Sequence, residues 1–313
     1  MVSYKISLKK KIILLFYNKM SEIKLLPEEY LKYNKKEYNN LFGEWQNNLK
    51  ELNEKFVNAK PFEYVIIDNF LNDEYANKIE ELFPTDIEKS HKYCNPIEVK
   101  NTNDNINEMP EEIRKLIYVL SNDELINMFR EISGIKNLEY DEYLLGAGLD
   151  TYPRNGRLNL HLDYEKHSIT GKQRRINIIL YLSKGWKEEW AGATELWNKD
   201  VSECVAKSNV KFNSALIFIT NEISWHGVPE KINCPEGIFR KSLAYYYVSP
   251  LETLPCKDKF GADSNGYRAK ASFIKRPQDP DCPKMRKLYA LRPIKRIDKE
   301  DMEKIWPEWT PDL

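Results

Sequence analysis

Seven short segments rich in β-forming residues follow one another closely in the second half of the chain, with turn residues between them. They span residues 143–152, 157–161, 174–183, 193–198, 202–207, 214–220 and 240–249. Several alternate apolar and polar residues with a period of two, as a strand with one buried face does. Many short strands at close spacing predict a β-sandwich or a barrel.

A strand and two helices are expected before this β-rich region. Residues 62–70 are rich in strand-forming residues, whereas 73–83 and 110–133 have the spacing of helices. The polar, Asn-rich residues 88–109 between the two helices predict a loop. The sequence therefore predicts an α+β fold with a double-stranded β-helix core, the jelly-roll or cupin-like architecture, braced by helices.

Composition divides the chain into three parts. Residues 1–60 are rich in Lys, Asn, Glu and Tyr, and their apolar residues recur every three or four positions from Leu41 to Phe56, which predicts a helical extension. Residues 61–250 carry the β-rich domain. Residues 251–313 are basic and proline-rich with acidic residues near the end, which predicts a solvated, charge-balanced extension with a short terminal helix.

Charge and cysteine content exclude some classes of protein. Lys plus Arg and Asp plus Glu both number 48, so the formal net charge is zero, which argues against an electrostatic nucleic-acid binder. Five scattered cysteines predict reduced thiols and not a disulfide framework. The apolar stretch Ile12–Tyr17 follows three lysines but is too short to span a bilayer. We therefore expect an N-terminal helix, no membrane contact and a cytoplasmic location.

One strand pattern brings together two metal-binding residue types. Residues 158–163 alternate apolar and polar side chains. Residues two apart on a strand point to the same face, so His161 and Asp163 can reach one ion while Leu160 and Leu162 are buried on the other face. An H-x-D pair alone is a weak motif, and a surface strand with two polar residues is the competing interpretation.

His226 is the candidate for a third ligand. It follows the apolar segment 214–219 and a short loop, and a later strand of a jelly roll can return to the same mouth as Asp163. Two histidines and one carboxylate on one face of a metal leave three positions open, which is the facial triad of non-haem Fe(II) oxygenases. The same ligands could instead hold Zn(II) in a non-oxygenase cupin.

A bidentate 2-oxo acid at the open positions needs a second anchor for its far carboxylate. Arginine supplies two parallel charged hydrogen bonds for that purpose. Arg240 begins the last strand after His226, and Ser242 faces the same side and could add a hydroxyl. A zinc hydrolase has no reason to keep a cation there. Arg174 and Arg175 begin another strand and are competing candidates for the anchor.

Further motifs surround these residues along the chain. They are, in order, Pro61-Phe62, Ile66-Ile67-Asp68-Asn69-Phe70-Leu71, Tyr152-Pro153-Arg154-Asn155-Gly156, His161-x-Asp163, Arg174-Arg175-Ile176-Asn177, Leu180-Tyr181-Leu182, Trp190-x-Gly192-x-x-Glu195-Leu196, His226-Gly227-x-Pro229 and Arg240-Lys241-Ser242. Over roughly residues 61–250 this set resembles the prolyl 4-hydroxylase-like branch of the 2-oxoglutarate/Fe(II)-dependent dioxygenase superfamily.

The resemblance implies a role for each site residue. The stretch between His226 and Arg240 is longer than in the best-known prolyl hydroxylases, which is a departure from the family pattern. Asn177 shares a strand with Tyr181 at even spacing and should face the same pocket, although Tyr152 and Tyr181 could both be ordinary core aromatics. The implied positions are His161, Asp163 and His226 for iron, and Arg240, Tyr152, Tyr181, Asn177 and Ser242 for 2-oxoglutarate.

The resemblance also implies an activity. It points to an Fe(II)- and 2-oxoglutarate-dependent hydroxylase that consumes O₂, with ascorbate as an additional candidate cofactor. The favoured substrate is a prolyl residue of a peptide or protein. A small molecule or a sugar is the alternative substrate, and a catalytically silent cupin-like binding module is the alternative class.

Overall fold

The structure is a computed structural model that describes residues 40–85 and 90–311. The helical character expected for residues 1–39, including Ile12–Tyr17, lies outside the described residues. Within the described ranges no helix is both long and apolar enough to cross a membrane. The five cysteines are free thiols, as predicted.

The described elements alternate between helices and strands before a long β-rich stretch. The helices are η2 (Glu44–Asn48), α3 (Leu49–Asn58), α4 (Asp73–Glu81), η3 (Ile106–Glu108), α5 (Glu111–Leu120), α6 (Asp123–Ser133), η4 (Glu188–Trp190), α7 (Pro283–Leu291) and α8 (Lys299–Ile305). The strands are β1 (Tyr64–Ile67), β2 (His91–Asn95), β3 (Glu98–Asn103), β4 (Glu139–Tyr140), β5 (Gly148–Tyr152), β6 (Arg157–Leu162), β7 (Gln173–Tyr181), β8 (Glu195–Trp197), β9 (Cys204–Lys207), β10 (Ser214–Ile219), β11 (His226–Val228), β12 (Arg240–Ser249) and β13 (Ser272–Phe273). Each of the seven predicted β segments overlaps one of these strands.

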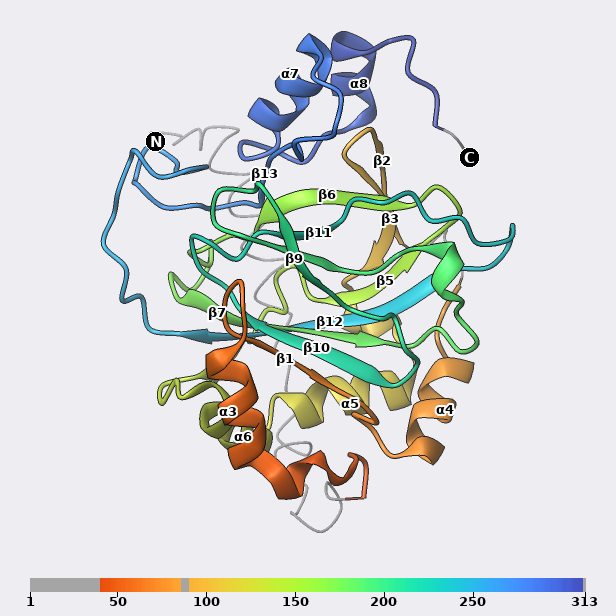
Figure 1. Ribbon diagram of the computed structural model, residues 1–313, viewed down its shortest axis with the longest axis vertical. Coiled ribbons are helices and arrows are strands. Elements are labelled where there is room, and N and C mark those ends of the chain that lie inside the picture. The colour runs from red at the N-terminus through yellow and green to blue at the C-terminus, as the bar shows by residue number, and fades with distance from the viewer. Residues whose placement is uncertain (1–39, 86–89, 312–313) are drawn as a thin grey trace, which may run out of the picture.

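The strands form one curled antiparallel sheet. Its order is β1-β10-β7-β12-β5-β3-β6-β11-β8-β9, and β2, β4 and β13 pair with β3, β12 and β6. Helices α3, α4, α5 and α6 lie together on one side of the sheet, whereas α7 and α8 lie at the opposite end of the molecule, beyond β6 (Figure 1). The predicted jelly-roll core braced by helices is thus confirmed.

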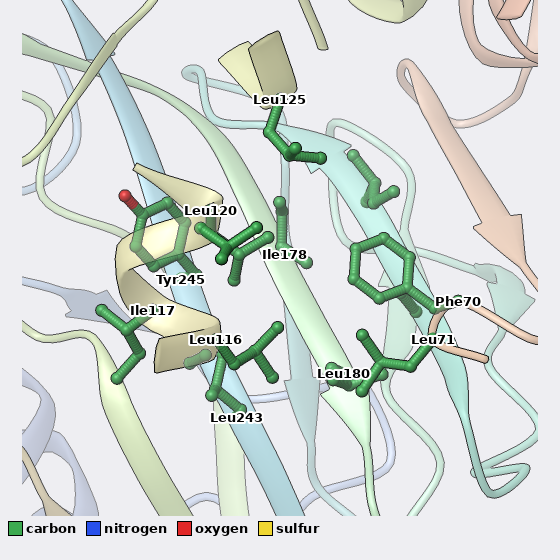
Figure 2. Packing of buried hydrophobic residues seen from close by; sticks show 14 of the residues in the cluster. Phe70, Leu71, Leu116, Ile117, Leu120, Leu125, Ile178, Leu180, Leu243 and Tyr245 are labelled. Atoms are coloured by element: carbon green, nitrogen blue, oxygen red, sulfur yellow. The ribbon is translucent and has the colours of Figure 1, made fainter. Parts of the chain in front are cut away.

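The largest hydrophobic cluster fills the space between the sheet and the helices. Ile178 and Leu180 of β7 and Leu243 of β12 form part of its floor, and Leu116 and Leu120 of α5 lie over them (Figure 2). All five side chains are fully buried, and burial of each such side chain contributes about 1.5–3 kcal/mol relative to leaving it exposed.

Strand β12 shows how this packing positions a site on the other face of the sheet. Leu243, Tyr245 and Tyr247 point into the helix-side cluster. Because side chains alternate along a strand, Arg240 and Ser242 point to the inner side of the curled sheet, where they line a cavity.

The predicted loop at residues 88–109 is wrong. Strands β2 and β3 form a hairpin there, and β3 also pairs with β5 and β6. The buried residues of β3 include Glu98, which lines the cavity, and Asn101 and Thr102, which hydrogen-bond to Thr151 and Asp150 of β5. The apolar alternation that identifies a strand in sequence is therefore missing.

The single helix predicted over residues 110–133 is also wrong, because the chain forms two helices. α5 ends at Leu120, and Asn122 then caps α6 by accepting a hydrogen bond from the backbone N–H of Glu124. Asparagine at an N-cap satisfies an otherwise unpaired donor of a new helix, which explains the break.

The C-terminal segment is not the solvated extension that its composition predicts. Strand β13 pairs with β6, and Phe273 and Leu288 are buried in one cluster with Ile97. Arg292 forms a buried two-bond ion pair with Glu98, at 2.7 and 3.1 Å. Basic residues of this segment are therefore held inside the molecule by acidic partners elsewhere in the chain.

Candidate active site

Two histidines face each other across neighbouring strands. His161 of β6 and His226 of β11 are directly paired in register, and their ring centroids lie 4.3 Å apart. Asp163 follows β6 immediately and points to the same side as His161. One potential ligand atom from each of the three buried residues lies within 4.8 Å of the others. The strand pairing therefore brings the three predicted metal ligands together.

The hydrogen bonds of both imidazoles orient their free nitrogens. Nδ1 of His161 lies 3.0 Å from the carbonyl of Asn159, and Nδ1 of His226 lies 2.9 Å from that of Ser224. A carbonyl only accepts, so each Nδ1 donates and each Nε2 keeps its lone pair. Burial and the neighbouring His161 lower the pKa of His226 to about 3, so its imidazole is neutral near pH 7. Both Nε2 atoms lie 3.6 Å from the Asp163 carboxylate.

Asp163 is held as a carboxylate. Burial alone would raise its pKa, but Arg174 and the two histidines outweigh burial and keep the pKa well below its usual range. A terminal nitrogen of Arg174 lies 3.0 Å from Oδ2, and the Asn177 amide donates to the same oxygen at 3.2 Å. Two imidazoles whose Nε2 atoms face Asp163, together with one ionised carboxylate, are a donor set that fits a divalent transition metal.

The two competing arginines are placed differently from Arg240. Arg174 contacts Asp163, and its guanidinium carbon lies 3.1 Å from the centroid of the Tyr246 ring. Arg175 turns away and pairs with Glu252 at 2.9 Å. Each of these two arginines therefore already has an acidic partner.

Arg240 is a buried cation whose partners are all neutral. Only 1% of it is exposed. Its Nε donates to the carbonyl of Gly192 at 2.7 Å, and its terminal nitrogens donate to the hydroxyls of Ser242 and Thr194 at 3.3 Å. Among the described residues no carboxylate lies within ion-pair distance of it. A buried charge without a counter-ion is costly, so this environment calls for an anionic ligand.

Aromatic rings enclose the Arg240 guanidinium. Its carbon lies 4.8 Å from the ring centroid of Tyr152 and 5.0 Å from that of Tyr181. Tyr152 lines the cavity, and burial raises the pKa of its hydroxyl to about 12, so it stays protonated. The Tyr181 hydroxyl instead hydrogen-bonds with the hydroxyls of Thr194 and Ser208, which places Tyr181 behind Arg240 and outside the cavity lining.

The Arg240 side chain leaves little room for any residue other than glycine at position 192. A Cβ there would lie 3.1 Å from Cδ of Arg240, and the residue has φ of +88°, a conformation that other residues rarely adopt. Glycine therefore permits the close approach of this carbonyl to Arg240.

One cavity of about 310 Å³ contains both the metal-ligand candidates and Arg240. Of the other predicted site residues, Tyr152, Asn177 and Ser242 line it and Tyr181 does not. Sequence reasoning missed a further group of lining residues on the β2–β3 hairpin and in the C-terminal segment. They are Tyr93, Glu98, Lys100, Lys270, Phe273, Arg292 and Arg296.

The two remaining histidines lie outside the ligand set. His91 is exposed on β2. His167, predicted as a loop residue, is buried, with Nε2 3.1 Å from the carboxylate of Asp141. Its Nδ1 accepts the backbone N–H groups of Ile169 and Thr170, so His167 stabilises the loop that follows Asp163.

Comparison with known families gives one match. Residues 147–248 match the family described as the 2OG-Fe(II) oxygenase superfamily. The matched region contains the three metal-ligand candidates and Arg240. No curated protein is similar enough in sequence to match the chain.

Several solved structures are similar in shape at low identity. A prolyl-4-hydroxylase from Pseudomonas putida has 15% identity and a TM-score of 0.46, with 63% of this chain and 98% of that chain covered. A prolyl hydroxylase in complex with a hypoxia inducible factor oxygen degradation domain peptide fragment, from Trichoplax adhaerens, has 16% identity and a TM-score of 0.49 over 66% and 94%. HygX from Streptomyces hygroscopicus, with nickel, 2-oxoglutarate and hygromycin B bound, has 12% identity and a TM-score of 0.40 over 60% and 82%.

Proposed function

We propose that this chain, whose residues 147–248 match the 2OG-Fe(II) oxygenase superfamily, hydroxylates a C–H bond of its substrate in the cavity beside His161, Asp163 and His226. The cofactors of this superfamily are Fe(II) and 2-oxoglutarate. The observation that carries the proposal is that one cavity contains a donor set suited to a divalent metal and a buried arginine with no acidic partner in the part of the chain that the structure describes.

The metal would be held by His161, Asp163 and His226 through two imidazole Nε2 atoms and one carboxylate. Such a facial set leaves positions for a bidentate 2-oxo acid and O₂. When bound, iron and 2-oxoglutarate supply the oxidising power that inserts one atom of O₂ into a C–H bond, while 2-oxoglutarate becomes succinate and CO₂. The protein's own contribution is binding, orientation and exclusion of water.

Arg240 would bind the far carboxylate of 2-oxoglutarate. Its Nε is already held by Gly192, so the guanidinium is fixed in position before the ligand arrives. The Tyr152 ring would cover the ligand, and Ser242 would add a hydroxyl. Tyr181 would act indirectly, by supporting Arg240 from behind.

Asn177 and Arg174 would position the carboxylate ligand. Both contact Oδ2 of Asp163. This arrangement restricts rotation of the carboxylate, and partners of metal ligands are known to raise metal affinity in this way. The sequence also predicted that Asn177 contacts 2-oxoglutarate. Because Asn177 lines the cavity, we keep this contact as part of the proposal.

The proposed substrate is a prolyl residue of a peptide or protein. This proposal is supported by the ordered set of motifs over residues 61–250. We propose that these residues form the dioxygenase domain and that residues 251–313 complete one wall of its cavity. A small molecule or sugar is the alternative substrate. A silent binding module is disfavoured, because it has no reason to keep a complete donor set beside a buried arginine that makes no ion pair within the described residues.

The test is conversion of 2-oxoglutarate to succinate by purified protein with Fe(II), O₂ and ascorbate. We expect slow conversion without substrate, loss of conversion in Asp163→Ala, and stimulation by some member of a panel of proline peptides and small metabolites. Wild-type protein that binds iron yet forms no succinate with any of them would support the silent module. The member that stimulates conversion, identified by the added oxygen in its mass, separates the two substrate classes.

A further inference from the structure

The cavity is more basic than the chain as a whole. The chain has a formal net charge of zero. Six basic and three acidic side chains line the cavity, so its wall carries an excess of three positive charges when these groups have their usual charges. The basic residues are Lys100, Arg174, Arg240, Lys270, Arg292 and Arg296, and the acidic ones are Glu98, Asp150 and Asp163.

Each acidic residue already has a basic partner. Arg292 pairs with Glu98 at 2.7 Å, Lys100 with Asp150 at 3.0 Å, and Arg174 with Asp163 at 3.0 Å. The excess therefore resides in the three remaining cations, which are Arg240, Lys270 and Arg296.

The proposed cofactors leave this excess unchanged. Fe(II) and the 2-oxoglutarate dianion have opposite charges of equal size. Arg240 is assigned to the far carboxylate of 2-oxoglutarate. Lys270 and Arg296 are then the lining cations with no strong partner: no described carboxylate lies within ion-pair distance of Lys270, and the nearest one to Arg296 is Asp104 at 4.0 Å.

Two further features favour a negatively charged ligand here. Arg296 lies 5.5 Å from the ring centroid of Tyr93, which also lines the cavity, so its guanidinium is directed along this wall. Deeper in the cavity, Nε and Nη2 of Arg174 make no hydrogen bond within the described residues, although Nη2 is close to Asp163. A wall of one sign attracts ligands of the opposite sign and favours their orientation.

We propose that the substrate carries an anionic group, most simply a carboxylate, which binds between Lys270 and Arg296 while the C–H bond to be oxidised faces the metal. This inference rests on the proposed function. The carboxylate could belong to an acidic residue beside a target proline or to a free small acid, and both sources present the same chemistry to the two cations.

The test compares ligands that differ only in charge. Protein saturated anaerobically with Fe(II) and 2-oxoglutarate, so that Arg240 is occupied, is titrated with two matched pairs and followed by ligand-observed NMR. The peptide pair is Ac-Pro-Glu-NH₂ and Ac-Pro-Gln-NH₂, and the small-molecule pair is N-acetylproline and N-acetylprolinamide. We expect the acid of at least one pair to bind more tightly than its amide, and the pair that discriminates identifies the source of the carboxylate.

Variants assign any preference to the two cations. In the double variant Lys270→Gln/Arg296→Gln the acid should bind about threefold to tenfold more weakly, the range expected for two solvent-accessible ion pairs. Lys287→Gln is the matched control, because Lys287 is exposed on α7 in the same segment and does not line the cavity. It should behave as wild type.

The outcomes separate this inference from the proposed function. A visible charge-transfer band from bound Fe(II) and 2-oxoglutarate, recorded in every sample, reports on the proposed function alone. If the band is present but acids and amides bind equally, or neither binds, the inference is overturned and the oxygenase assignment stands. It is also overturned if the acid preference survives in the double variant.

Discussion

The phenyl ring of Phe273 stacks on the imidazole of His161, with centroids 4.9 Å apart and ring planes 20° apart. The two residues are directly paired between β13 and β6, and His226 is paired with His161 from β11. His161 is therefore fixed by neighbours on two strands. One of these strands belongs to the C-terminal segment, which thus contributes to the proposed metal site as well as to the cavity wall.

Removal of the Phe273 ring should weaken metal binding. In Phe273→Ala the imidazole of His161 loses its stacking partner, and we expect iron affinity to fall by about tenfold, the lower end of the effect of losing groups that orient metal ligands. Competition of the protein with a metal-binding dye measures this affinity. Phe273→Leu keeps an apolar neighbour and should lose less. Equal iron affinity in Phe273→Ala and wild type would show that stacking does not position His161.

The buried ion pair between Arg292 and Glu98 should be important for stability. Only 9% of the Arg292 side chain and 2% of the Glu98 side chain are exposed, so Arg292→Ala leaves a buried carboxylate without its partner. We expect the free energy of unfolding to fall by about 3–5 kcal/mol, measured by urea denaturation.

A matched surface pair provides the control for this prediction. Arg286 of α7 pairs at 3.0 Å with Asp281, which lies just before that helix, and both side chains are largely exposed. Arg286→Ala should therefore cost less than about 1 kcal/mol. Similar losses in the two variants would contradict the view that the C-terminal helices are anchored through Glu98.

Arg240 should determine the affinity for 2-oxoglutarate without affecting iron. Losing one partner of a buried charge pair costs about 3–5 kcal/mol, so Arg240→Ala should weaken 2-oxoglutarate binding by a factor of hundreds or more while iron binding stays nearly intact. Arg240→Lys should recover part of the affinity, because Lys keeps the charge but loses the two-pronged geometry. Isothermal titration of the metal-loaded protein with 2-oxoglutarate measures this affinity in both variants. Competition with a metal-binding dye measures their iron affinity.

The other two arginines test that assignment. Arg175→Ala should titrate like wild type, because Arg175 pairs with Glu252 away from the cavity. Arg174→Ala should weaken iron more than 2-oxoglutarate, because Arg174 contacts Asp163. If Arg240→Ala binds 2-oxoglutarate normally and Arg174→Ala does not, the anchor has been assigned to the wrong arginine.

The sequence predicts those parts of the molecule in which a local pattern coincides with the fold. The alternation around His161 and Asp163 predicts their common face because β6 is an ordinary strand with apolar residues behind it. Arg240 and Ser242 follow the same rule on β12. The prediction that His226 lies beside His161 and Asp163 depended on the jelly-roll topology. The number and spacing of the predicted strands indicated that topology.

The parts that were missed depend on contacts between distant residues. The polar side chains of β3 are buried because Glu98 lines the cavity and Asn101 and Thr102 hydrogen-bond to β5, so the strand shows no apolar period. Arg292 is buried because Glu98, far away in the sequence, neutralises it. No local window contains both residues of such a pair, and a basic, proline-rich composition then predicts solvent exposure incorrectly.

The central claim is that His161, Asp163 and His226 hold Fe(II) next to an Arg240-bound 2-oxoglutarate. Anaerobic addition of Fe(II) and 2-oxoglutarate to the purified protein tests it most directly by visible absorption spectroscopy. We predict a weak metal-to-ligand charge-transfer band in wild type that is absent from His161→Ala and His226→Ala. Wild-type protein with confirmed iron content and no such band, or a band that persists in both alanine variants, would contradict the claim.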